Sequence, residues 1–194
     1  MRVNVVAGMR LGFDAMHIPP ARHDRLARAC EAVGAKFVPC ARNPVDAIWH
    51  DQPAPPMGQV TAMPLQFAGR STTEKSKALW QSLEAQGVTL HVETQPDNIS
   101  WFLNVRGTDV AFNPMPQGFL IANRAGQIFW FVARRKLSDD VLEALPSEVS
   151  VREPEAFLHV LEELTTSDSV VAVDPDFSPV AVRQVLEALG TEVI

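Results

Sequence analysis

The pattern of apolar and polar positions alternates between two periods along the chain. Short apolar or alternating runs predict strands over 9–14, 36–40, 88–92, 118–122, 127–133 and 170–173. Apolar residues at helical spacing predict helices over 20–33, 71–86, 97–106, 139–145, 157–164 and 182–189. Because strands and helices alternate, the sequence predicts an α/β fold whose mixed sheet is flanked by helices.

Several polar residues stand where helices are expected to begin or end. Pro20 begins the first predicted helix, and Gly34 is placed to end it. Ser71 and Glu74 have the Ser-x-x-Glu spacing of a capping box, which predicts the start of the second long helix. Asp97 is placed to cap the helix that follows.

The chain begins and ends with similar strand–helix–strand pieces. Residues 11–38 and 171–194 share the order strand, aspartate, helix, glycine, strand, which reflects either an internal repeat or a chance recurrence of a common α/β pattern. Residues 43–63 are rich in proline, which fixes φ and removes a backbone donor, so this segment predicts an extended linker. The sequence therefore predicts a βαβ end of a first domain at 1–42, a linker at 43–63 and a complete domain at 64–194.

The charge and the length of the apolar runs exclude two classes of partner. The chain has 17 Lys and Arg against 23 Asp and Glu, a formal net charge of −6, so it offers no basic surface for nucleic acid. No apolar run approaches the roughly 20 residues that span a bilayer. The first ten residues contain no apolar core of signal-peptide length, so we expect a cytoplasmic protein.

No motif in the sequence forms a self-sufficient active site. Cys30 and Cys40 lie neither in a C-x-x-C pair nor near a histidine at ligand spacing. Asp14 and Asp174 follow predicted strands, but no G-x-G-x-x-G accompanies them, so we interpret both as caps of the next turn. A G-x-S-x-G elbow and a phosphate-binding loop are absent from the sequence too. None of the five histidines lies at i, i+4 to another, and we interpret each as structural or solvated: His17, His23, His50, His91 and His159.

The densest group of candidate residues lies in segment 99–114. Its first half has helical apolar spacing, after which Arg106, Asp109 and Asn113 fall in a turn-rich stretch where side chains can point at a ligand. The simpler interpretation is an Arg106–Asp109 ion pair with Asn113 as a turn former. Spacing alone favours the simpler interpretation.

Three segments together resemble a known family. They are NPVDAIW at 43–49, AGRS at 68–71 and ISWFLNVRGTDV at 99–110. In this order and spacing they resemble Xaa-Pro aminopeptidases of the three-domain aminopeptidase P type, and Asn-x-Arg-Gly-x-Asp is the most specific piece. The resemblance runs from about Leu11 to the C-terminus. It implies that residues 64–194 form a creatinase/prolidase N-terminal-like domain with a ribonuclease H-like fold, preceded by a βαβ remnant of a similar domain.

The resemblance also implies what this chain lacks. In that family a "pita-bread" domain holds two divalent metal ions, usually manganese, with two Asp, one His and two Glu, and these ions generate the hydroxide that attacks the Xaa-Pro bond. No segment here matches those ligands, so the resemblance assigns no catalytic and no metal-binding residue to this chain. We expect the chain alone to be inactive and the catalytic domain to follow Ile194.

The implied role is to support a catalytic domain. The resemblance implies that the chain shapes substrate access and oligomerisation, with three partners: its own catalytic domain, a peptide with proline at the second position and a second copy in a homodimer. The candidates for facing the substrate cleft are Arg106, Asp109, Phe112 and Asn113, since a cation and amide donors suit peptide carbonyls or a carboxylate.

Two other classes of function remain as alternatives. One is a stand-alone peptide- or protein-binding module without enzymatic activity, although a βαβ piece without sheet neighbours would expose apolar surface. The other is a small nucleotide-binding α/β domain, which the missing phosphate loop disfavours.

Overall fold

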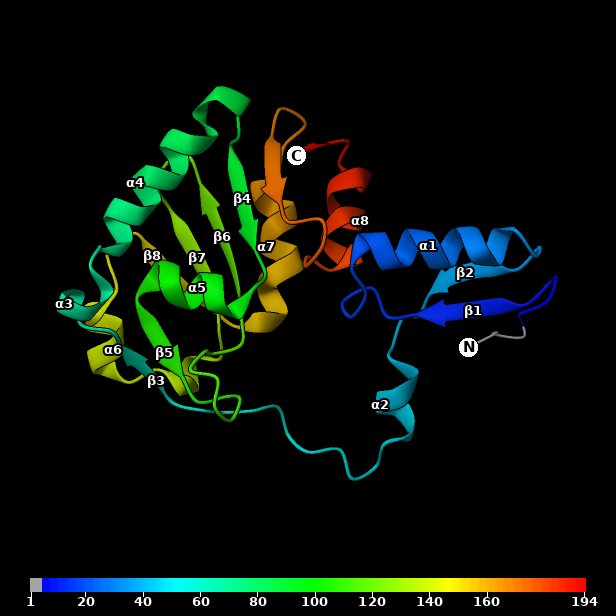
Figure 1. Cartoon of the computed structure of the whole chain (residues 1–194), viewed down its shortest axis with the longest axis horizontal. Helices are drawn as coiled ribbons and strands as arrows, with labels where there is room; N and C mark the ends of the chain where they lie inside the picture. The colour runs from blue at the N-terminus through cyan, green and yellow to red at the C-terminus, as the bar shows by residue number, and fades with distance from the viewer. Residues whose placement is uncertain (1–4) are drawn as a thin grey trace. The chain divides into compact units, whose positions relative to one another are not determined.

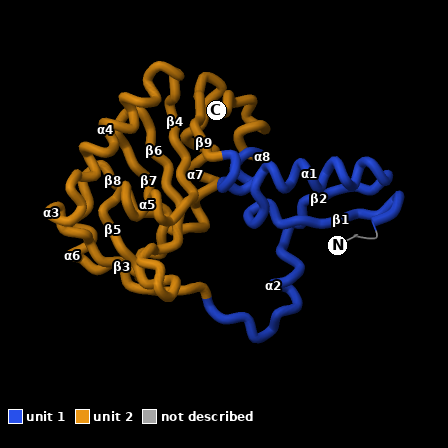
Figure 2. Tube along the Cα trace, viewed as in Figure 1, with its two compact units in different colours: residues 1–54, 175–184 blue, residues 55–174, 185–194 orange. Residues whose placement is uncertain are grey.

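The computed structural model describes residues 5–194 and divides the chain into two compact units. The first unit comprises Met1–Ala54 with Pro175–Gln184, and the second comprises Pro55–Asp174 with Val185–Ile194 (Figure 2). The predicted first domain starts at residue 1, so its first four residues lie outside the described ones.

The first unit is built on a parallel pair of strands connected by a helix. Strand β1 (Arg10–Phe13) pairs with β2 (Lys36–Pro39), and Leu11 lies opposite Phe37. Helix α1 (Pro20–Glu31) makes the connection, as its sequence spacing predicts (Figure 1). The short helix α2 of this unit follows at Pro44–Ile48.

A segment from near the C-terminus completes the core of the first unit. Phe13, Ile18 and Val180 are buried together. The Val180 amide donates to the Ile18 carbonyl at 2.8 Å, and the Ala181 amide donates to the Ala15 carbonyl at 3.0 Å. These contacts explain why Pro175–Gln184 belongs to this unit, whereas the sequence placed it in the second domain.

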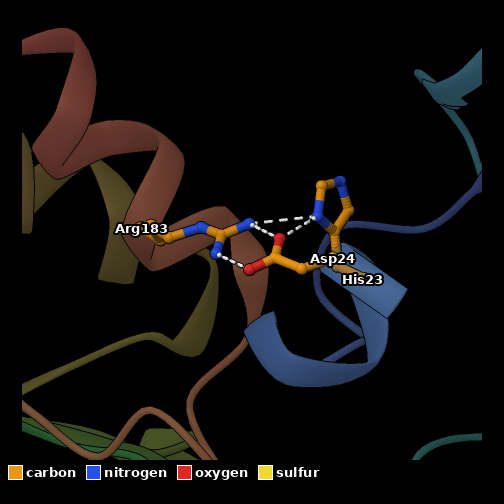
Figure 3. Close-up of polar contacts among 3 residues, drawn as sticks. All are labelled: His23, Asp24 and Arg183. Carbon is orange, nitrogen blue, oxygen red and sulfur yellow. Dashed lines mark hydrogen bonds and ion pairs between the residues drawn. The ribbon is translucent and has the colours of Figure 1, made fainter. Parts of the chain in front are cut away.

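An ion pair joins helix α8 (Val180–Ala188) to α1 within this unit (Figure 3). The Arg183 guanidinium donates to the two Asp24 carboxylate oxygens at 3.0 and 2.8 Å and also lies 3.0 Å from Nδ1 of His23. The His23 ring in turn meets the edge of Phe13, with centroids 4.8 Å apart. The hydrogen bonds from Arg183 and then His23 hold the pKa of Asp24 well below its usual value.

The second unit contains a six-stranded mixed sheet with the order β10-β9-β4-β6-β7-β8. The pairs β10–β9, β9–β4 and β7–β8 are parallel, while β4–β6 and β6–β7 are antiparallel. This confirms the predicted mixed sheet. The strands are β4 (Leu90–Glu93), β6 (Phe119–Asn123), β7 (Ile128–Phe131), β8 (Val149–Arg152), β9 (Val170–Val173) and β10 (Glu192–Val193).

Alternate side chains of the sheet pack against helices on its two faces. On one face, Leu120 and Trp130 join a buried cluster with Phe102 of helix α5. On the other face, Phe119 stacks on Phe157 of helix α7 at 4.4 Å between ring centroids, and Phe131 meets the edge of Phe157 at 5.3 Å. The sheet is therefore the middle layer of three, as the prediction of flanking helices requires (Figure 1).

The remaining elements of the second unit are short or surround the sheet. A small antiparallel sheet pairs β3 (Val60–Ala62) with β5 (Val105–Gly107). The helices are α3 (Leu65–Ala68), α4 (Thr72–Leu83), α5 (Pro96–Leu103), α6 (Asp139–Ala144) and α7 (Phe157–Leu164). Short 3-10 turns lie at Glu84–Gln86, Arg134–Lys136 and Pro154–Ala156. In the described part of the chain, no helix combines the length and apolar character that crossing a membrane requires.

The predicted helix ends are partly confirmed. The capping box is present, with the Glu74 amide donating to Ser71 Oγ at 3.2 Å and the Ser71 amide donating to the Glu74 carboxylate at 2.7 Å. The prediction that Asp97 caps α5 is wrong, because Pro96 takes the first helical position and Gln95 is the N-cap.

We predict that Arg183→Met destabilises the first unit by about 1 kcal/mol, because it removes a partly buried bidentate ion pair. Hydrogen exchange of α1 amides measures this loss. Since the folded pKa of Asp24 is depressed below 3.8, the difference from the unsubstituted protein should be complete above that pH. It should vanish as the pH falls through the folded pKa.

The matched control is Arg124→Met, which breaks an exposed Arg124–Glu84 pair at 3.5 Å. It should change stability by less than about 0.5 kcal/mol. Equal effects of the two substitutions would contradict the assigned role of Arg183.

Candidate functional site

The Asn-x-Arg-Gly-x-Asp element begins where helix α5 ends. Asn104 is the C-cap of α5 and has left-handed backbone angles of φ 56° and ψ 48°, which asparagine tolerates better than most residues. Its Nδ2 donates to the Arg70 carbonyl at 2.8 Å, and its Oδ1 accepts from Nζ of Lys75. The asparagine therefore turns the chain sharply from α5 into β5.

Two cations, Arg106 of this element and Lys75 of α4, lie at the C-terminal end of α5. Nη1 of Arg106 donates to the carbonyls of Ser100 and Val105 at 3.3 and 2.7 Å, and Nζ of Lys75 donates to the Trp101 carbonyl. Positive charge is favourable there because helix carbonyls point toward it. Lys75 is buried, and burial, followed by the nearby Arg106 charge, lowers its pKa.

Asp109 forms a buried ion pair, but not with the partner that spacing suggested. The Asp109 side chain has no exposed surface, and its Oδ2 accepts from Nζ of Lys136 at 2.6 Å. The Gly58 amide donates to Oδ1 at 2.9 Å, and the Gln117 amide donates to Oδ2 at 2.6 Å. The predicted Arg106–Asp109 pair is therefore wrong, because Nη1 of Arg106 donates to the carbonyls of Ser100 in α5 and Val105 in β5, and Asp109 pairs with Lys136.

Two glycines allow the backbone to close tightly around this carboxylate. A Cβ at Gly58 would lie 2.4 Å from the carbonyl carbon of Thr108, and a Cβ at Gly107 would lie 2.6 Å from the Pro116 nitrogen. Neither backbone neighbour can move aside easily, so any larger residue would open the structure. Residues 108–117, called the 108–117 loop below, are thus anchored at both ends.

The tip of the 108–117 loop presents an aromatic side chain to solvent. Phe112 is fully exposed, at 107% of its reference area, and has a positive φ of 62°. Val110 and Asn113 form an isolated bridge across the tip, with the Asn113 amide donating to the Val110 carbonyl at 3.1 Å. A bulky residue with this φ costs about 1 kcal/mol or more, and Phe112 recovers none of it by burial.

The structure separates the four candidate residues into two groups. Phe112 and Asn113 are exposed at the loop tip, whereas the side chain of Asp109 is buried and Arg106 donates to the Ser100 carbonyl near the end of α5. Sequence reasoning missed Lys136, the partner of Asp109. It also missed Gly58, which lies in the proline-rich segment, and no local pattern connects either residue to Asp109.

The described residues offer no site for the metal ions that the resemblance implies. Within residues 5–194, no group of three or more His, Cys, Asp or Glu side chains is placed to hold a metal ion. The two cysteines are unpaired, with Cys30 buried. A dinuclear metal centre therefore does not fit this part of the protein, and no step of chemistry is assigned to its residues.

We predict that Asp109→Asn and Lys136→Met each lower the free energy of unfolding by about 3 kcal/mol, because each leaves a buried charge without its partner. The double variant should lose less than the sum of the two. Chemical denaturation of all four proteins measures the coupling.

The matched control is Asp139→Asn, which removes an exposed partner of Arg134 at 3.6 Å and should change stability by less than about 0.5 kcal/mol. Additive effects of Asp109→Asn and Lys136→Met would mean that the two charges do not support each other.

We predict that Phe112→Asn raises the free energy of unfolding by about 0.5–1 kcal/mol, because asparagine adopts a positive φ at lower cost. Thermal unfolding measures the change. Phe67→Asn is the control, since Phe67 is 74% exposed in α3 and does not have a positive φ. A loss of stability in Phe112→Asn would show that the phenyl ring packs within this chain.

Sequence comparison matches residues 51–193 to the family described as the Creatinase/Prolidase N-terminal domain. Aminopeptidase P1 of Lotus japonicus is 31% identical over 154 residues, which cover 79% of this chain and 23% of that protein. Aminopeptidase P1 of Arabidopsis thaliana is 29% identical over 140 residues, which cover 72% of this chain and 22% of that protein. The chain thus spans about a quarter of the length of these relatives.

Structure comparison finds the fold of this chain in a solved aminopeptidase structure. The crystal structure of X-prolyl aminopeptidase from Caenorhabditis elegans, described as a cytosolic enzyme with a di-nuclear active site, superposes with a TM-score of 0.88 and 22% sequence identity. The superposition covers 98% of this chain and 32% of that one. With the profile match extending over 51–193, the chain belongs to the Creatinase/Prolidase N-terminal domain family.

Proposed function

We propose that this chain acts as the non-catalytic N-terminal region of a dimetal Xaa-Pro aminopeptidase, where it shapes the access of peptides to an adjoining catalytic domain. The observation that carries the proposal is Phe112, a fully exposed aromatic residue in a strained conformation on an anchored loop. Strain without compensating burial is expected where a residue is selected for contact with another molecule. The similarity to aminopeptidase P proteins supports the choice of an Xaa-Pro aminopeptidase as the enzyme.

Within the proposal, the four candidate residues have two roles. Phe112 and Asn113 face the substrate cleft, the phenyl ring offering an apolar contact and the Asn113 amide offering hydrogen bonds to a peptide backbone. Asp109 and Arg106 position these two residues. Asp109 does so through its ion pair with Lys136, and Arg106 through its hydrogen bond to the Ser100 carbonyl of α5. The buried carboxylate supports this division because it has no surface left for a substrate.

The proposal assigns the metal ions and most of the partners to regions beyond the described residues. The adjoining catalytic domain would hold two divalent metal ions, manganese in our proposal, and would bind a peptide with proline at the second position. The absence of a metal-binding group among residues 5–194 supports placing the metals there. We further propose homodimerisation, to be measured by sedimentation, and a cytosolic location like that described for the Caenorhabditis elegans enzyme.

A stand-alone peptide- or protein-binding module without enzymatic activity is the second candidate function. The same exposed Phe112 favours it, since an aromatic side chain on a rigid loop is a common anchor of protein interfaces. The two candidates differ in whether Phe112 influences hydrolysis.

The test joins this chain at Ile194 to a creatinase-type catalytic domain and measures hydrolysis of an Xaa-Pro tripeptide with added manganese. We predict activity in the joined protein and none in the 194-residue chain. Phe112→Asn should lower kcat/KM of the joined protein roughly tenfold, about 1.4 kcal/mol of transition-state stabilisation.

Phe67→Asn controls for the loss of any exposed phenylalanine and should leave kcat/KM within about twofold. Hydrolysis by the 194-residue chain would overturn the non-catalytic assignment. Unchanged kcat/KM in Phe112→Asn would instead remove the cleft role and favour the binding module.

A further inference from the structure

A cavity of about 410 Å³ lies within the second unit, between one face of the sheet and helices α4 and α5. Its volume falls in the range of small-molecule sites, roughly 300–1,000 Å³. Leu79 of α4, Phe102 of α5 and Leu120 of β6 supply apolar lining, while His91 and Glu93 of β4 supply polar groups. The cavity is separate from the 108–117 loop, none of whose residues lines it.

The polar groups converge because of the strand register. His91 and Glu93 are two positions apart on β4, so both side chains point to the same face of the sheet. Leu120 lies directly opposite Glu93 on β6 and shares that face. A ligand in the cavity would therefore meet a carboxylate beside an apolar surface.

The Glu93 carboxylate is held in place but keeps acceptor capacity. Its Oε1 accepts from the amides of Thr94 and Gln95 at 2.9 and 2.8 Å. Its Oε2 accepts from Nδ2 of Asn98 at 2.9 Å. A carboxylate has about four acceptor positions, so one position on Oε2 remains for a further donor.

The surroundings of Glu93 favour a positively charged partner. Asp174 follows β9, the parallel neighbour of β4, and Val173 lies opposite Val92 in the register. Burial first, and then the Asp174 charge, raise the pKa of Glu93 above its ordinary value. A bound cation would relieve both effects, because it replaces lost solvation and offsets the repulsion between the carboxylates.

His91 adds a second acceptor in the same cavity. Burial lowers the pKa of His91, so the ring is neutral at pH 7. Its Nδ1 is buried and has no hydrogen-bond partner among the described residues. In the tautomer with the proton on Nε2, Nδ1 can accept from an N–H donor of a ligand.

The cavity also contains a cation, Lys75, whose charge is already used. Its Nζ donates to Trp101 and Asn104 and lies 4.5 Å from the centroid of the Trp101 ring. These partners are at the C-terminal end of α5. Glu93, in contrast, accepts from the amide of Gln95, the N-cap residue of α5. The eight-residue helix is about 12 Å long, so the cavity has an acidic end and a basic end.

We propose that this cavity binds a small organic ammonium ion, with the nitrogen at Glu93 and His91 and an apolar body between Leu79, Phe102 and Leu120. The proposal goes beyond the function proposed above and does not depend on it. Its selectivity rests on charge, because a neutral or anionic ligand of the same shape would leave the Glu93 acceptor without a cation.

The experiment titrates the 194-residue chain with 2-phenylethylammonium, 2-phenylethanol and 3-phenylpropionate by calorimetry and amide NMR at pH 7. The ammonium ion should bind at least tenfold more tightly than the other two and shift amide signals of α4, α5 and β4. Glu93→Gln should weaken its binding at least tenfold, and Leu79→Trp, which fills the cavity, should abolish it.

Glu84→Gln is the matched control, because the Glu84 side chain is 69% exposed outside the cavity, and it should leave binding unchanged. Thermal unfolding of each variant separates loss of binding from loss of folding, and Glu93→Gln carries the test if Leu79→Trp does not fold. Equal binding of the three probes, no binding of the ammonium ion, or full binding by folded Glu93→Gln would each overturn the proposal.

Discussion

The buried ion pair between Asp109 and Lys136 is the constraint on which the display of the candidate site depends. A carboxylate without exposed surface is tolerated only where charge and hydrogen bonds replace water, and here one ammonium and two backbone amides do so. The three donors come from residues 58, 117 and 136, which are distant in sequence. The Asp109 side chain thus fixes the start of the 108–117 loop, its end, the segment just before β3 and the turn at Arg134–Lys136.

This arrangement changes how the most specific sequence element is understood. Asn104 and Arg106 complete the end of α5, and Asp109 anchors the loop that follows, so the polar residues of the element form a scaffold. Among the four candidate residues, Phe112 and Asn113 remain exposed for contact, and neither belongs to the Asn-x-Arg-Gly-x-Asp element. Polar residues in a loop can therefore hold the loop in place without being the residues that contact another molecule.

Local patterns predicted the elements well, because helix periodicity, strand alternation and the Ser71–Glu74 capping box are encoded within a few residues. What the sequence could not predict depends on distant partners. The sheet β3–β5 pairs residues 60–62 with 105–107, and three-residue strands carry too few positions for a periodic signal. The Asp109–Lys136 pair and the attachment of residues 175–184 to the first unit are likewise decided by tertiary contacts.

Amide hydrogen exchange at Gly58 and Gln117 measures whether the buried Asp109 carboxylate orders the 108–117 loop before any partner binds. We expect both amides to be as protected as core amides of β6 and to lose that protection in Lys136→Met. Exchange of these two amides at the rate of an unstructured chain in the unsubstituted protein would mean that the carboxylate does not order the loop.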